Sequence, residues 1–294
     1  MAESMQDIKR RMRSIESTQH ITNAMRLVSA AKFRKAKSIF DKTNLHLGRV
    51  IDMMEELLAS VPSLPEQYAY QKEKAYKRTA YILITSSKGL CGGFNNNLLK
   101  ALTEEMHNNE AENGAQKEDA TIYAVGLRGR DHFQRLGYRI AGEYTEAPEK
   151  ITFREAKEIA GPILECYQNG EVDQVVIIYT NYVNSLKQEP VVKRMLPMEP
   201  IEKDARGGLI ELEYVPSSEE IIAYLIPKYF EIMLFQAVIE SATCEHAARR
   251  TAMENATDNA KDMLNSLSLT YNRARQQAIT DELIEIVAGS EAQH

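Results

Sequence analysis

"ATDNAKDMLNSLSLTYNRARQQAIT" occupies residues 256–280, close to the end of the 294-residue chain. The stretch contains no Gly or Pro and is rich in good helix formers, so it predicts one continuous helix. Its apolar side is narrow and partly built from alanine, which would let a second helix approach closely. An isolated helix of this length gains little from propensity alone. The stretch therefore predicts a long helix with a partner.

The helix breakers of the chain are concentrated in its middle. Eight of nine Pro and twelve of fourteen Gly lie between Pro62 and Pro216. This distribution predicts three parts: an N-terminal coiled-coil helix (1–61), an α/β head domain (76–208) and a C-terminal coiled-coil helix (215–289) that pairs with the first.

Residues 1–61 carry an apolar stripe whose steps are all three or four residues, with a mean near the coiled-coil period of about 3.5. The stripe, with three polar interruptions, comprises Met5, Ile8, Met12, Ile15, Thr18, Ile21, Met25, Val28, Lys32, Ala36, Ile39, Thr43, Leu47, Val50, Met54 and Leu57. At 1.5 Å per residue, this helix would be roughly 80 Å long.

The C-terminal helix has its own start signals and stripe. Ser217 and Glu220 have capping-box spacing, and Pro227 predicts a kink or a second start. From residue 228 to 288 there is no Gly or Pro. The stripe comprises Met253, Ala256, Ala260, Met263, Leu267, Tyr271, Ala274 and Ala278.

Neither helix can bury its stripe alone, so the simplest arrangement is an antiparallel coiled coil of the two, with the middle segment inserted between them. An ordinary helical bundle is the alternative, but it requires turns that the two arms lack. In the middle segment, β-rich runs at 79–85, 121–127, 138–145, 174–183 and 189–197 alternate with helical patterns. This alternation predicts a Rossmann-like α/β head with a mostly parallel sheet.

The loop "SSKGLCGG" in the head was tested as a phosphate-binding turn. Its spacing matches neither Gly-x-Gly-x-x-Gly nor the P-loop, and Lys88 precedes the glycines instead of following them. We therefore interpret Gly89, Gly92 and Gly93 as turn residues and Cys91 as a small buried residue.

No catalytic, cofactor-binding or metal-binding constellation is present in the sequence. The six His residues form no His-Glu-x-x-His motif, and no Gly-x-Ser-x-Gly elbow occurs. We expect His20 and His246 to contact a partner or solvent. The three Cys residues are widely spaced, which indicates a reducing compartment. No run approaches the roughly 18–20 apolar residues of a membrane span.

Charge is distributed unevenly along the chain. The net charge is −6, but residues 1–50 alone carry a net +7. Such a basic segment indicates either an acidic partner or a solvated helix face.

Three strings closely resemble the γ-subunit family of F-type ATP synthases: "IKRRMRSIESTQHITNAMRLVSAAKFRKA" (8–36), "SSKGLCGGFN" (86–95) and "EHAARRTAMENATDNAKDMLNSLSLTYNRARQQAITDELIEIVAGSEA" (245–292). They lie in both arms and the head, so the resemblance covers the whole chain. Two departures are visible. Ser87 stands where the family usually has an acidic residue, and the regulatory Cys pair of the chloroplast form has no counterpart.

The resemblance implies a non-catalytic rotor without a cofactor. Its partners would be the hexamer of α and β subunits, the ε subunit and the c-subunit ring, with no nucleic acid. It would lie at the cytoplasmic face of the bacterial cell membrane and contact the membrane only through the complex. The positions that match family contacts with the hexamer are Arg10, Met25, Lys32, Arg275, Gln276, Thr280 and Glu282. The family's head-domain loop corresponds to Lys88, Gly89, Cys91, Gly92 and Gly93.

Two other functional classes are weighed against this one. A coiled-coil adaptor or nucleic-acid-binding rod would use the basic N-terminal arm, and its affinity would fall steeply with salt. The arm lacks the aromatic side chains of a single-strand platform. A small-molecule enzyme in the head would need a site that the sequence does not contain.

Overall fold

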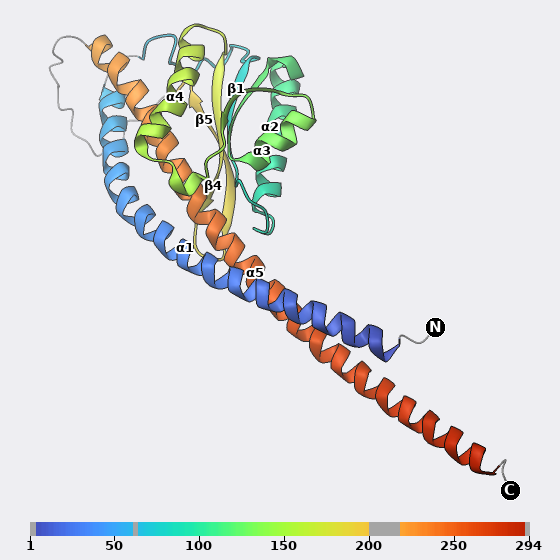
Figure 1. Ribbon diagram of the computed structural model, residues 1–294. Helices are drawn as coiled ribbons and strands as arrows, with labels where there is room; N and C mark the ends of the chain where they lie inside the picture. The colour runs from blue at the N-terminus through green and yellow to red at the C-terminus, as the bar shows by residue number, and fades with distance from the viewer. Residues whose placement is uncertain (1–3, 61–63, 200–217, 292–294) are drawn as a thin grey trace. The chain divides into compact units, whose positions relative to one another are not determined.

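The computed structural model describes residues 4–60, 64–199 and 218–291 (Figure 1). The two longest elements are α1 (Met5–Ser60) and α5 (Ser218–Glu291), one at each end of the chain. By their internal contacts, the residues form two compact units, Met1–Ala30 with Arg249–His294, and Ala31–Ala248. Each helix therefore contributes a segment to each unit. The division into an N-terminal helix (1–61), a head domain (76–208) and a C-terminal helix (215–289) stays a prediction.

The first unit is a pair of antiparallel helical segments from α1 and α5 (Figure 1). Buried side chains mark the seam between them: Ile8 and Ser29 from α1, Met253 and Ala260 from α5. Thr257 Oγ1 also lies 2.9 Å from Thr22 Oγ1, a hydrogen bond across the seam. Small residues such as Ser29 and Ala260 let the two helices approach closely, and the hydrogen bond between Thr22 and Thr257 helps to fix their register.

The stripe expected for α1 is confirmed towards both ends of the helix and wrong at five positions between residues 18 and 39. Thr18, Ile21, Val28, Lys32 and Ile39 are exposed. The buried or half-buried positions lie mostly one residue later: Gln19, Thr22, Ser29, Phe33 and Phe40. At these five positions the expected residue lies one place before the buried one, and the expected and observed stripes coincide again from Thr43 to Leu57.

The stripe expected for α5 is largely confirmed. Met253, Ala256, Ala260, Leu267, Tyr271 and Ala274 are buried or half-buried, but Met263 and Ala278 are exposed, and Leu264 takes the place of Met263. Pro227 lies inside α5 without interrupting it, so the second start expected there is wrong. The predicted capping residue Ser217 lies outside the described residues.

The second unit is built on a five-stranded sheet with the order β3-β2-β1-β4-β5. Its strands are β1 (Thr79–Ile84), β2 (Ala120–Val125), β3 (Arg139–Tyr144), β4 (Gln174–Tyr182) and β5 (Gln188–Leu196). β1 is parallel to β2 and β4, and β2 is parallel to β3. β5 runs antiparallel to β4. The mostly parallel sheet expected from the sequence is confirmed.

Helices cover both faces of this sheet (Figure 1). On one face, α2 (Phe94–Asn113) and α3 (Leu127–Arg135) pack over Tyr81 and Leu83 of β1. On the other, α4 (Phe153–Gln168) packs with the second-unit segments of α1 and α5 over Ala80, Ile82 and Ile84. Side chains of β1 alternate between the two cores, as the pleat of a strand requires. Two 3-10 turns, η1 (Lys117–Asp119) and η2 (Pro148–Lys150), complete the elements.

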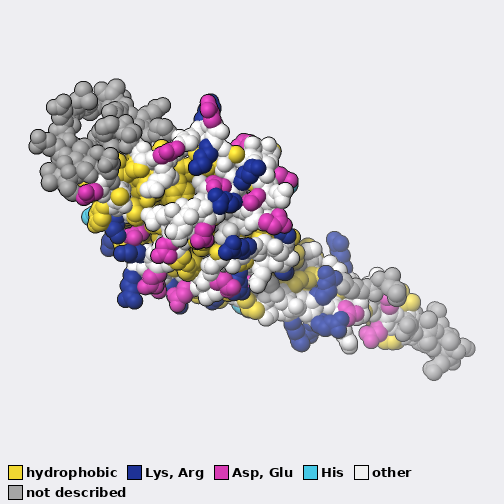
Figure 2. Space-filling model, turned by 90° about the horizontal axis from the view of Figure 1, so that it is seen from above, with side chains coloured by type: hydrophobic (Ala, Val, Ile, Leu, Met, Phe, Trp, Pro, Cys, Tyr) yellow, Lys and Arg dark blue, Asp and Glu magenta, His cyan; other side chains and the backbone are white. Residues whose placement is uncertain are grey.

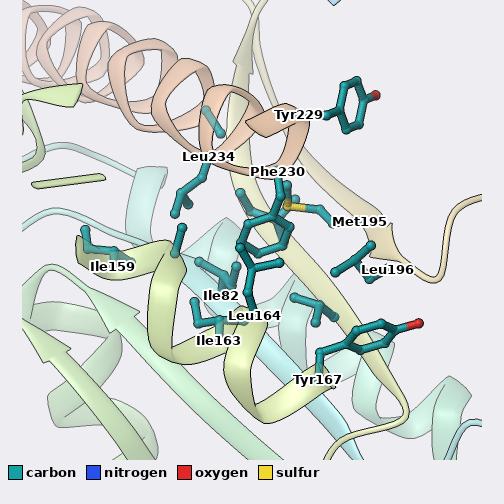
Figure 3. Close-up of a cluster of buried hydrophobic side chains, with 14 of the residues drawn as sticks. Ile82, Ile159, Ile163, Leu164, Tyr167, Met195, Leu196, Tyr229, Phe230 and Leu234 are labelled. Atoms are coloured by element: carbon teal, nitrogen blue, oxygen red, sulfur yellow. The ribbon is translucent and has the colours of Figure 1, made fainter. Parts of the chain in front are cut away.

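The larger core joins the sheet, α4 and α5 (Figure 3). Phe230 and Leu234 of α5 meet Ile163 of α4 above Ile82 of β1, and all four are buried. Because this core includes Ile51 and Leu58 of α1 as well, it fixes segments from both ends of the chain on one sheet face.

Part of α5 is long and apolar enough to cross a membrane, although no such segment was expected from the sequence. Within Glu220–Ile284, one 18-residue window has a mean hydropathy of 1.4, and half of that window is buried inside the protein. Ile222, Ile226 and Phe230 lie in the core described above. A core helix explains this apolar character.

Candidate interaction surfaces

The last turns of α5 form an uncovered helical surface in the first unit. Every side chain described from Arg275 to Ile284 is exposed. Ile279, Leu283 and Ile284 are large apolar residues among them, each about half exposed or more. In Figure 1, α5 continues past the first described residues of α1, which explains why no helix among the described residues covers this segment. Clustered exposed apolar residues of this kind mark an interaction surface.

The four sequence-predicted residues of this segment share its exposure. Arg275, Gln276, Thr280 and Glu282 are all exposed, and the Thr280 hydroxyl donates to the Gln276 carbonyl oxygen at 2.9 Å. They therefore add charged and polar groups to a surface that also carries apolar side chains. Such a mixture suits contacts that must be specific and reversible.

The three predicted residues of α1 have different surroundings. Arg10 is exposed and pairs with Asp7, with 3.0 Å between Nη2 and Oδ1. Met25 is half-buried in the first unit. Lys32 belongs to the second unit, where its ammonium lies 2.6 Å from Glu149 Oε1. On the face of the molecule drawn in Figure 2, Lys and Arg side chains are interspersed with Asp and Glu.

The head-domain loop between β1 and α2 is a tight turn held by side chains. Asn95 Oδ1 accepts from the Ser86 backbone N–H at 3.0 Å, and Asn95 Nδ2 donates to the Cys91 sulfur at 3.2 Å. Cys91 is buried, as predicted. Gly92 has a φ of 58°, a left-handed conformation that favours glycine. The turn interpretation of this loop agrees with the structure.

Gly89 of the same loop lies close to the end of the Arg128 side chain. A Cβ added at Gly89 would stand 2.8 Å from the Arg128 guanidinium nitrogen. Lys88 is exposed beside it. Ser87, the residue in place of the usual acidic one, donates its hydroxyl to the Thr145 carbonyl oxygen at 3.2 Å. Ser87 therefore ties the loop to the end of β3 without adding a charge.

The expectation that His246 contacts a partner or solvent is wrong, and no role was predicted for Glu149. His246 is only 2% exposed, and its Nε2 lies against Glu149 Oε2 in the second unit. It contacts neither solvent nor, by its burial, a partner. Glu149 lies on η2, 117 residues from Lys32 in the chain. No sequence motif signals this meeting, because only the folded head brings η2 to the helices.

Comparisons with known proteins agree on one family. The sequence profile described as ATP synthase matches residues 4–293. The chain is 41% identical to the "ATP synthase gamma chain" of Pelotomaculum thermopropionicum, over 98% of this chain and 99% of that one. The chain belongs to the ATP synthase gamma chain family. A further gamma chain, described as sodium ion specific, comes from Acetobacterium woodii and is 39% identical over 99% of both chains.

Solved structures show that this gamma-family chain shares the fold of rotary-stalk proteins. A chain of the Euglena gracilis mitochondrial ATP synthase superposes with a TM-score of 0.68 at 21% identity, covering 99% of this chain and 94% of that one. A chain of the Tetrahymena thermophila mitochondrial enzyme, in a structure of its central stalk and c-ring, gives 0.59 at 23% identity, covering 80% and 99%. Membership of the gamma chain family confirms a non-catalytic subunit that is a peripheral part of a membrane-bound complex.

Proposed function

We propose that the chain is the central-stalk rotor of an F-type ATP synthase and couples transmembrane ion flow to ATP synthesis or hydrolysis by rotating inside a hexamer of α and β subunits. The observation that supports this most directly is the exposed end of α5, where apolar side chains have no cover among the described residues. An apolar sleeve formed by surrounding subunits would bury them. Family membership supplies the identity of those subunits.

The remaining partners are assigned in the same proposal. The ε subunit and the c-subunit ring would bind the rotor outside the hexamer, and the membrane would be reached only through the complex. The site of action would be the cytoplasmic face of a bacterial cell membrane. The bacterial relatives at about 40% identity support that location.

Coupling requires the rotor to bind the conformations of the catalytic subunits unequally. A ligand shifts a conformational equilibrium only by its differential affinity for the two states. A helix surface that differs from side to side meets this requirement, and a featureless cylinder would not. The end of α5 has such a difference, since Arg275 and Glu282 lie two turns apart on one side of the helix, whereas exposed Leu283 lies about 100° around the axis from Glu282.

The predicted contact residues take specific roles in this proposal. Arg10, Lys32 and Arg275 would form ion pairs with acidic loops of the hexamer, and each pair must break as the rotor turns. Arg side chains can bind carboxylates in a bidentate manner. Met25 would make a flexible apolar contact. Gln276, Thr280 and Glu282 would contact the β subunits near the end of α5.

The experiment that tests the proposal is co-expression of the full chain with α and β subunits from a relative. We expect all three to co-purify and to hydrolyse ATP, and the isolated chain to hydrolyse none. Failure of the chain to join α and β would overturn the proposal. Salt-sensitive binding of the isolated chain to nucleic acid, without assembly, would favour the basic-rod alternative instead.

A further inference from the structure

Glu149 joins two basic side chains from opposite ends of the polypeptide. Its Oε1 accepts from the Lys32 ammonium at 2.6 Å, and its Oε2 lies against His246 Nε2. Lys32 comes from α1, His246 from α5 and Glu149 from η2, and all three belong to the second unit. One carboxylate therefore holds one partner with each oxygen.

The three side chains differ sharply in exposure. The His246 side chain is 3% exposed, that of Glu149 is 23% exposed and that of Lys32 is 49% exposed. His246 is thus the buried end of the cluster, and Lys32 is its exposed end. Because His246 is fixed in the packing of α5, Glu149 is held in place even when Lys32 moves away.

Electrostatics within the cluster keep Glu149 charged. Burial works to raise the pKa of Glu149, but Lys32 and His246 outweigh it and hold the pKa of this carboxyl below its ordinary value. An ammonium has three donors, and Glu149 occupies one of those of Lys32. Because the Lys32 side chain is half-exposed, its ammonium can meet a second carboxylate from outside while Glu149 still competes for it.

We propose that Glu149, anchored by His246, is an internal competitor that weakens the contact of Lys32 with acidic groups of the surrounding subunits and makes that contact reversible. The proposal rests on the proposed rotor function, since it needs acidic partners that pass Lys32 in turn. Glu149 is a positioning residue in this account: it touches no nucleotide and acts only through Lys32. Each time an external carboxylate leaves, Glu149 takes the ammonium back.

The test uses the full chain assembled with α and β. Glu149→Gln removes the negative charge but keeps an oxygen that can face His246. Glu146→Gln is the matched control, because Glu146 is exposed and lies three residues away in the same segment. We expect Glu149→Gln to slow ATP hydrolysis at low ionic strength by roughly two- to fivefold, the scale of one partly exposed ion pair. The cause would be an over-tight contact of Lys32.

Further measurements distinguish competition for the Lys32 ammonium from a purely structural role of Glu149. Raising the ionic strength should return the Glu149→Gln rate towards that of the control, since salt screens exposed charges. In a chain that already carries Lys32→Gln, Glu149→Gln should have no further effect, because the freed ammonium is gone, so the double variant should match Lys32→Gln alone. Glu149→Asp, which keeps the charge, should behave nearly as the unchanged chain.

The outcomes are distinguishable. Glu149→Gln and Glu146→Gln giving equal rates would overturn the inference while leaving the rotor function intact. An equal slowing by Glu149→Gln in a chain that already carries Lys32→Gln, or a slowing that persists at high salt, would also overturn it, because the role of Glu149 would then be packing alone. Failure of the rotor function itself is seen earlier, as loss of assembly of the unchanged chain with α and β.

Discussion

At the scale of single residues, an ion pair between Arg78 and Asp173 joins the residues that directly precede β1 and β4. Arg78 Nη2 donates to Asp173 Oδ1 at 2.6 Å, and the Arg78 backbone N–H donates to Oδ2 at 2.9 Å. The next residues along, Thr79 and Gln174, are paired in the β1–β4 ladder. Burial works to raise the pKa of Asp173, but the bonds from Arg78 outweigh it and hold the pKa of that carboxyl below its ordinary value.

This pair predicts a pH-dependent contribution to stability. A lowered folded-state pKa stabilises the protein above the unfolded pKa of about 3.9, and the contribution is lost as the pH falls through the folded pKa. Asp173→Asn should therefore lower the free energy of unfolding at pH 7, with the difference shrinking below about pH 4. Urea unfolding of both chains at neutral and acid pH measures this. Asp262→Asn, at an exposed position, is the control. A difference that stays constant into the acid range would contradict the assignment.

Thr152 begins α4 and supplies a second residue-scale prediction. Its hydroxyl accepts from the Glu155 N–H at 3.3 Å, and the Glu155 carboxylate accepts from the Thr152 N–H at 2.7 Å. Thr152→Ala removes half of this capping box and should cost about 1 kcal/mol of unfolding free energy. Chemical denaturation gives the value. Thr103→Ala, inside the exposed face of α2, should cost little by comparison. Equal losses would show that the cap contributes nothing specific.

At the scale of elements, the seam of the first unit depends on small residues. Ala260 is buried in it, whereas Ala278, from the same sequence stripe, is exposed. Ala260→Phe should overpack the seam and destabilise the helix pair by about 1–3 kcal/mol. Ala278→Phe should change stability by less than about 0.5 kcal/mol. Thermal unfolding followed by helical circular dichroism compares the two, and an equal effect would contradict the seam.

The helices and the head show which features of the structure can be predicted from the sequence. The two long helices, the alternation of strands and helices in the head and the buried Cys91 follow from helix breakers, periodicity and turn chemistry. The register of α1 does not follow, because Lys32 and Phe33 are neighbours and only contact with the head decides which is buried. Phe33 and Phe40 both pack near the Tyr182 ring, at 6.2 Å and 5.8 Å between centroids. Contacts between distant segments, such as Lys32 with Glu149, leave no periodic signal.

At the scale of the whole molecule, the two units differ in how well they are buried. The second unit has two hydrophobic cores, one on each face of its sheet. The first has a single narrow seam, and the side chains of α5 from Arg275 to Ile284 are exposed. Local opening is favoured where few apolar contacts hold the backbone. The isolated chain should therefore exchange its amide hydrogens very unevenly.

Hydrogen exchange before and after assembly tests this difference together with the rotor function. In the isolated chain, amides of residues 275–284 should exchange quickly, while those of β1 should exchange only through rare opening of the head. On assembly with α and β, residues 275–284 should slow by at least about tenfold, since burying Leu283 and Ile284 would oppose fraying. Peptides from β1 serve as the internal control and should change little. Fast exchange of residues 275–284 in the assembled complex would mean that the end of α5 stays uncovered, and the proposed sleeve of α and β subunits around it would be wrong.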